Sequence, residues 1–110
     1  MGKIMINATN IGIIFDEICS VFFEYDGGYI ALAQDDGGII IGKDEPDNVV
    51  YVDFGDVKYF LQKDNIEIII DEGAELGIDF ERHFLISFTP DTEQYAELEK
   101  ALEHIFSSLD

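Results

Sequence analysis

The chain has 110 residues, of which 47% are hydrophobic, and it includes nine Phe and five Tyr, a composition typical of a folded domain and unlike that of a disordered chain. Its formal net charge of −18, from 24 acidic and six basic residues, argues against nucleic acids and anionic membranes as partners, because binding to either relies on Lys and Arg. The single cysteine, Cys19, excludes an internal disulfide and indicates a reducing compartment.

We expect one domain over residues 1–110, with a strand-rich sheet over residues 1–88 and a helix over residues 89–109. The opening segment MGKIMINATN contains no long apolar run, which predicts neither a signal peptide nor a membrane span. Together with the cysteine content, this indicates a cytoplasmic location.

Short apolar segments precede the predicted helix. They cover residues 4–8, 11–16, 20–26, 29–34, 38–42, 48–54, 57–62, 66–71 and 83–88. Each is rich in Ile, Val, Phe or Tyr and is bounded by Gly, Asp or Asn, as strands are. Ile66, Ile68 and Ile70 alternate with their neighbours and should share one face. The connections are short, which predicts antiparallel pairing, because parallel strands need longer crossovers.

Two Asp-Gly-Gly units, 26–28 and 36–38, separate three of these segments. Glycine-rich loops can bind phosphate at a helix N-terminus, but these units lead into strands and are flanked by acids. Asp-Gly and Gly-Gly also supply the positive φ angles of tight hairpins. We therefore predict hairpin turns at both units.

The C-terminal segment has the pattern of an amphipathic helix. Thr89 and Pro90 suit an N-cap followed by the first helical position. The apolar residues that follow recur every three or four positions; they are Tyr95, Leu98, Leu102, Ile105 and Leu109. Segment 73–77 could add one helical turn before the last strand. The pattern as a whole predicts an α+β fold, an antiparallel β-meander of roughly seven to nine short strands with the C-terminal helix packed on one face.

The residues do not assemble a recognisable catalytic or metal-binding motif. No segment matches the ligand spacing of an EF-hand, and neither His83 nor His104 has a His or Cys at zinc-ligand spacing. Cys19 lies in an apolar strand segment, where a buried thiol is the ordinary interpretation. We therefore expect neither an enzyme nor a bound cofactor, and we keep weak calcium binding by loose carboxylates as an alternative.

Acidic residues are densest over residues 26–56, with eight acids and one lysine. The polar segment 43–48 follows the second Asp-Gly-Gly unit, and loops on a rigid sheet often make recognition contacts. An acidic surface also speeds encounter with a basic partner. The residues that we expect to contact such a partner are Asp35, Asp36, Asp44, Glu45 and Asp47.

Residues 39–106 resemble the bacterial immunity protein 10 family, found beside polymorphic toxins. The resemblance depends on an ordered series of segments: IIIGKDEPD, VVYVDF, VKYFLQKDNIEIIIDEGAELG and FLISFTPDTEQYAELEKALEHIF. It implies a small inhibitor that binds a cognate toxin and occludes its active or substrate-binding surface. Without the resemblance, an acidic scaffold module remains the other hypothesis, including a homodimer through an exposed strand edge.

Overall fold

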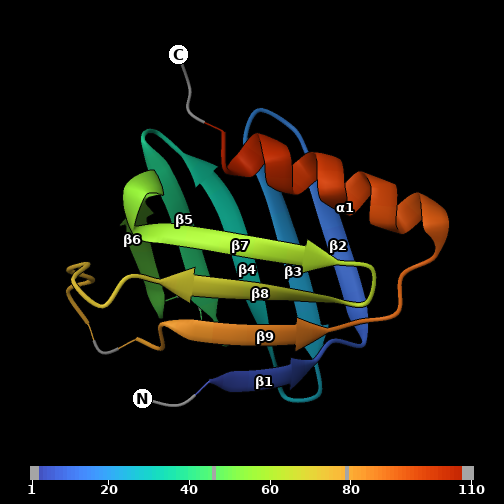
Figure 1. Cartoon of the computed structure of the whole chain (residues 1–110), viewed down its shortest axis with the longest axis horizontal. Coiled ribbons are helices and arrows are strands. Elements are labelled where there is room, and N and C mark those ends of the chain that lie inside the picture. Colours follow the sequence, from blue (N-terminus) through green and yellow to red (C-terminus); the bar gives the residue numbers. More distant parts are fainter. Residues whose placement is uncertain (1–2, 46, 79, 108–110) are drawn as a thin grey trace.

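Two β-sheets and one α-helix form two layers in the computed structural model, which describes residues 3–45, 47–78 and 80–107 (Figure 1). The first sheet has five antiparallel strands in sequence order: β2 (Asn10–Phe15), β3 (Cys19–Tyr25), β4 (Gly28–Asp35), β5 (Gly38–Lys43) and β6 (Val49–Asp53). The second sheet has the order β1-β9-β8-β7, with β1 (Ile4–Asn7), β7 (Val57–Gln62), β8 (Asn65–Ile70) and β9 (His83–Ser87). A short 3₁₀ turn, η1 (Phe54–Asp56), connects the two sheets.

The predicted α+β class and the C-terminal helix are confirmed, but the strands form two sheets where one meander was expected. Coverage of the apolar faces explains the difference. Helix α1 (Thr92–Ile105) has 14 residues and is about 21 Å long, whereas a single sheet of nine strands would be about 38 Å wide. One helix could not cover such a sheet, so the two groups of strands bury their apolar faces against each other.

One strand pair is parallel, contrary to the expected antiparallel meander. Strand β1 pairs with β9, with Ile4 beside Phe84 and Ile6 beside Ile86. Short connections enforce antiparallel pairing only between strands that follow each other in the chain. Because almost the whole chain separates β1 from β9, that constraint does not apply to them.

The core lies between the five-stranded sheet and the layer formed by the four-stranded sheet and α1. Strands of the two sheets cross at a steep angle in Figure 1. The inward side chains of the five-stranded sheet include Phe23, Ile30, Leu32, Ile39 and Ile41, all fully buried. The predicted apolar face of β8 is confirmed, since its three alternating isoleucines are buried.

Helix α1 lies beside β7 and contacts β2, β3 and β4 (Figure 1). Its buried stripe is Leu98, Ala101, Leu102 and Ile105, which confirms the predicted periodicity over these positions. The helix ends at Ile105 with Phe106 as its C-cap, so the predicted end at residue 109 is wrong, and Leu109 itself lies outside the described residues.

The predicted start of the helix is wrong by two residues. Asp91 is the N-cap, and its carboxylate accepts a hydrogen bond of 2.7 Å from the Gln94 N–H. A carboxylate both caps the free N–H groups and interacts favourably with the positive end of the helix dipole. These two effects favour Asp91 over Thr89. Segment 73–77 does not form the suggested helical turn, because its backbone is irregular and Gly77 has a φ of 80°.

Both Asp-Gly-Gly units form the predicted hairpin turns. Gly27 and Gly37 have φ angles of 96° and 76°, a region that glycine enters without steric cost. The second glycine of each unit begins a strand and allows a close approach. A Cβ atom on Gly38 would lie 2.3 Å from the Val52 carbonyl oxygen, so no larger residue fits there.

We predict that Asp91→Ala lowers the free energy of unfolding by about 1 kcal/mol, because it removes the cap from the N-terminus of α1. Thr89→Ala is the matched control and should change that free energy by less than about 0.5 kcal/mol. Urea denaturation followed by circular dichroism measures both. An equal loss for the two variants would contradict the assignment of Asp91 as the cap.

Candidate protein-binding surface

The five-stranded sheet has a second face that points away from the core, which we call the outer face. It lies on the side of this sheet away from the viewer in Figure 1. One row of outward residues crosses all five strands, pairing Gly12, Phe22, Ala31, Gly42 and Val49 side by side. This row consists of apolar residues only, whereas the solvated face of an antiparallel sheet normally presents polar residues.

A shallow hollow of ≈ 450 Å³ follows β4 on the outer face, and we call it the apolar hollow. Its lining residues are Gly12, Phe22, Glu24, Tyr29, Ala31, Ala33, Ile40, Gly42 and Val49. The small side chains lie on β4 and β5, between Phe22 on β3 and Val49 on β6. The alternation of large and small residues therefore creates the depression.

The margin of the outer face also contains exposed apolar side chains. Ile14, Val49 and Tyr51 are 46%, 45% and 43% exposed. Contiguous apolar surface of this kind is unusual on a monomer and is typical of interaction sites. The outer face is therefore a candidate binding surface.

Carboxylates surround the apolar hollow. Glu24 lies at one end, and Asp35, Asp36 and Asp53 lie at the other, where β4, β5 and β6 meet their turns. Segment 10–53 has ten acids and a single base, Lys43. Because Lys43 pairs with Ile30 in the inward-facing register, it does not offset the charge of the outer face.

The four-stranded sheet differs in its charge. Segment 57–88 has seven acids and three bases, and Lys3 precedes β1 on the same sheet. On its outward side, Glu67 accepts a hydrogen bond from His83 at 2.5 Å and lies 3.9 Å from the Lys3 ammonium. The five-stranded sheet therefore has a larger acidic surplus than the four-stranded sheet.

The structure places the five predicted contact residues in two groups. Asp35 and Asp36 lie at the β4–β5 turn, whereas Asp44, Glu45 and Asp47 lie in the β5–β6 loop. The six-residue strand β5 separates the groups by about 17 Å. They form no single cluster, but they bracket the outer face from opposite ends.

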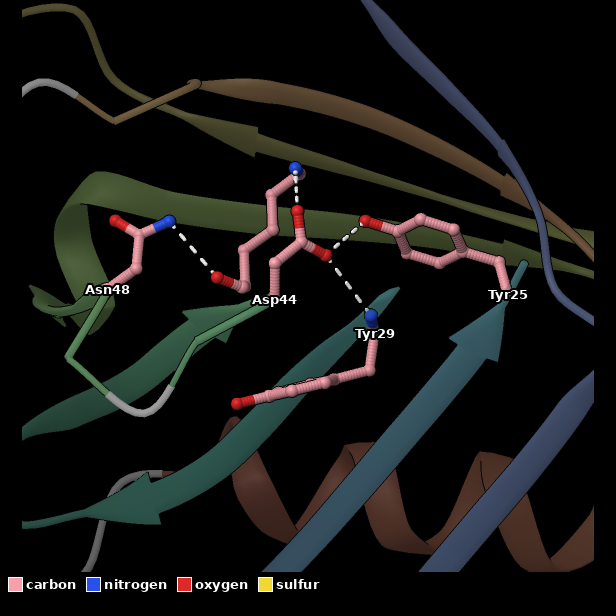
Figure 2. Close-up of polar contacts among 5 residues, drawn as sticks. Tyr25, Tyr29, Asp44 and Asn48 are labelled. Carbon is pink, nitrogen blue, oxygen red and sulfur yellow. Dashed lines mark hydrogen bonds and ion pairs between the residues drawn. The ribbon is translucent and has the colours of Figure 1, made fainter. Parts of the chain in front are cut away.

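Asp44 has a local structural role that the sequence did not reveal (Figure 2). Its carboxylate accepts hydrogen bonds from the Tyr25 hydroxyl at 2.5 Å and from the Tyr29 N–H at 3.1 Å. The Lys43 ammonium lies 2.7 Å from the other carboxylate oxygen. A Cβ atom on Gly28 would lie 2.0 Å from Asp44 Oδ1, so this glycine leaves room for the carboxylate. The cluster thus joins the β3–β4 turn to the β5–β6 loop.

The backbone of this loop supports the same arrangement. Asp44 has a φ of 67°, a left-handed conformation that Asp adopts more readily than most residues. The Asn48 side chain donates a hydrogen bond of 3.0 Å to the Lys43 carbonyl, and the Asp44 N–H donates one to the Tyr29 carbonyl at 3.0 Å. These bonds fix the loop at the edge of the outer face.

The charges of the cluster stabilise one another. Partial burial raises the pKa of Asp44, but the hydrogen bonds from Lys43, Tyr25 and Tyr29 outweigh it and hold that pKa below its usual value. The hydrogen bond to Asp44 raises the pKa of Lys43. Burial, together with the hydrogen bond to Asp44, raises the pKa of Tyr25. Asp44 is therefore ionised and compensated by Lys43, whereas Glu45 and Asp47 are exposed carboxylates of this loop with no salt bridge among the described residues.

The nucleophile and base candidates lie in different layers. Cys19 is fully buried in the five-stranded sheet, its Sγ 3.7 Å from the Ala101 carbonyl of α1, and burial raises the pKa of its thiol. His83 lies on the outward side of the four-stranded sheet, beside Glu67. The core separates the two side chains.

The part of the chain that the structure describes places no group of three or more His, Cys, Asp or Glu side chains so that they could hold a metal ion. Its helix is neither long nor apolar enough to cross a membrane.

Sequence reasoning missed the apolar hollow, although a signal for it exists. Segments 29–33 and 38–42, YIALA and GIIIG, contain no charged residue, so polar and apolar residues do not alternate along them. Strands that are apolar on both sides are typical of sheets covered on both faces. The absence of alternation therefore indicates a second face that needs a partner.

Comparison with known proteins gives no match: no family model, curated protein or solved structure is similar to this chain. The resemblance to the immunity protein family therefore stays a prediction. The function has to be argued from the outer face and its charge.

We predict that Asp44→Asn destabilises the fold by about 1 kcal/mol at pH 7, because it weakens charge-assisted hydrogen bonds that are partly screened by solvent. The pKa of Asp44 is lowered by folding, so its ionised form stabilises the chain above about pH 4, and this contribution is lost as the pH falls through the folded-state pKa. The difference between the two proteins should shrink as the pH is lowered.

Chemical denaturation at several pH values measures this difference. Asp47→Asn, an exposed carboxylate in the same loop, is the control and should unfold like the parent at every pH. A difference between parent and Asp44→Asn that is constant down to acidic pH would contradict the electrostatic role of Asp44.

Proposed function

We propose that this chain is a non-enzymatic immunity protein that binds a cognate bacterial toxin domain and occludes its active or substrate-binding surface. One observation supports the proposal most strongly: the outer face combines an apolar hollow with carboxylates at both ends and with no base on its outward rows among the described residues. Protein interfaces commonly have such an apolar centre and polar rim. The resemblance over residues 39–106 adds the toxin as the kind of partner.

The acidic rim favours a partner with a basic surface. A toxin that acts on nucleic acid needs Lys and Arg to bind its substrate, and an acidic protein would be steered to the same basic region. Bound there, the immunity protein would exclude the substrate. Occlusion of this kind requires no catalytic residue in the inhibitor.

A homodimer through the outer face, and not through the strand edge expected from the sequence, is the weaker alternative. In such a dimer, the segment with ten acids and one lysine would face the same segment of the other copy. Like charges brought together across an interface are unfavourable by several kcal/mol. The charge pattern therefore favours a different, basic partner over a second copy.

The direct test of the proposal starts from the gene immediately upstream. Its product, or the C-terminal domain of that product, should inhibit growth when expressed alone, and co-expression of this chain should restore growth. A purified complex should form between the two proteins. Growth inhibition that this chain does not relieve, or an upstream product without toxicity, would contradict the proposal.

We predict that reversing three exposed charges, with Asp36→Lys, Asp47→Lys and Asp53→Lys combined, slows association with the toxin domain by at least about fivefold at low salt. The three residues lie around the outer face, so the variant loses electrostatic steering. Stopped-flow fluorescence at several salt concentrations measures the rate.

The matched control combines Glu72→Lys, Glu75→Lys and Glu81→Lys. These exposed acids lie between β8 and β9, so the change in net charge is identical but its position is not. The control should associate nearly as fast as the parent. Equal slowing in both variants would assign the effect to net charge and would remove the outer face from the interface.

A further inference from the structure

We infer that the apolar hollow binds a basic amphipathic α-helix of the partner, which lies along β4. The inference takes the toxin as partner from the proposed function, but the shape and chemistry of the bound element are argued from the outer face itself. Four properties of that face bear on it: its width, its length, its lack of backbone hydrogen-bonding groups and its charge.

The width of the hollow fits one helix. Phe22 on β3 and Ile40 on β5 stand on either side of β4 in neighbouring outward rows, and β3 and β5 lie two strand spacings, or about 10 Å, apart. An α-helix with its side chains has a diameter of about 10 Å. Ala31 and Ala33 lie between them on β4, and such small side chains allow the helix to approach the sheet closely.

The length of the outer face along β4, from the hollow to the acid beyond it, also fits a short helix. From Tyr29 to Asp35, β4 extends for about 20 Å, which corresponds to about 13 helical residues. On the inner side of the same sheet, α1 has 14 residues and packs on β2, β3 and β4, so a helix of similar length already packs on this sheet.

Backbone hydrogen bonding decides between a helix and an extended segment. The N–H and C=O groups of β4 are already paired with β3 and β5, so the outer face presents side chains only. A helix satisfies its own backbone groups and can lie on such a surface. An extended peptide on this face would leave its backbone groups unpaired, which is costly; it would pair instead at an edge strand.

The acids around the hollow indicate which polar residues the bound helix should have. Glu24 lies at one end of the hollow and Asp35, Asp36 and Asp53 at the other. A helix with an apolar stripe facing Ala31 and with Lys or Arg near both ends would match this arrangement. The same acids disfavour an anionic membrane, a nucleic acid and a second copy of this chain.

The test uses a synthetic probe of about 14 residues, with Leu and Ala on one helical face and Lys near both ends. A hydrocarbon staple keeps it helical, because isolated helices of this length are marginal in water. Fluorescence anisotropy should show saturable binding to the full chain. A peptide with Glu in place of Lys, and a stapled peptide with its apolar residues scrambled around the helix, should each bind at least about tenfold more weakly.

Variants of the protein locate the binding site. Ala31→Arg and Ala33→Arg each place a long, positive side chain in the hollow and should weaken binding of the Lys peptide at least about tenfold. Ser87→Arg, on the outward side of the four-stranded sheet, is the matched control and should bind normally. Ile40→Ala removes one side of the hollow without adding charge and should weaken binding about threefold or more. Thermal melting establishes that each variant is folded.

The inference is overturned if the hollow variants, folded, bind the Lys peptide as the parent does, or if the Glu peptide binds equally well. The toxin domain then separates the inference from the proposed function. Toxin binding that Ala31→Arg leaves intact retains the immunity function and rejects the hollow as its site. Peptide binding at the hollow, with no protection against the upstream gene product, retains the docking mode and rejects the toxin as partner.

Discussion

Burial of the inner face of the five-stranded sheet is the constraint on which the rest of the structure depends. Phe23, Ile30, Leu32, Ile39 and Ile41 point from this sheet into the core and are fully buried, and burial of such side chains is the dominant favourable term in folding. Helix α1 and the four-stranded sheet together cover these side chains (Figure 1). Among residues 3–45, 47–78 and 80–107, no further helix or strand covers the other side, so the small and apolar residues of the outer face stay accessible. The arrangement thus stabilises the fold and exposes the candidate interface through the same five strands.

The acidic charge has two separate roles. Asp44 acts within the fold, where its carboxylate joins two turns through Tyr25, Tyr29 and Lys43. The exposed acids at the ends of β4 and β5 have no comparable role in the core and give the outer face its negative field. Net charge alone would not distinguish these roles, because Asp44 and the exposed acids contribute equally to the amino-acid composition. The contacts of each carboxylate separate them.

Much of the local structure could be predicted from the sequence, because alternation, turn glycines and helical periodicity are local patterns. The buried isoleucines of β8, the turns at Gly27 and Gly37, and the stripe of Leu98 and Leu102 belong to this class. The division into two sheets and the pairing of β1 with β9 depend on which apolar faces meet across long stretches of chain, and local patterns contain no such information. For the site, acidity near Asp36 and Asp47 could be read directly. The apolar hollow could not be located before the register placed Ala31 between Phe22 and Gly42.

The proposed binding of a basic partner at the outer face of the five-stranded sheet can be followed by methyl-labelled NMR of the full chain, titrated with the toxin domain from the upstream gene. Methyl groups report on both faces of the molecule in one spectrum. We expect the methyl resonances of Ala31, Ala33 and Ile40 to shift or broaden, whereas those of Ile69 and Leu85, on the outward side of the four-stranded sheet, should not change. Perturbation confined to Ile69 and Leu85, in a complex that forms and protects the cell, would contradict binding at the outer face.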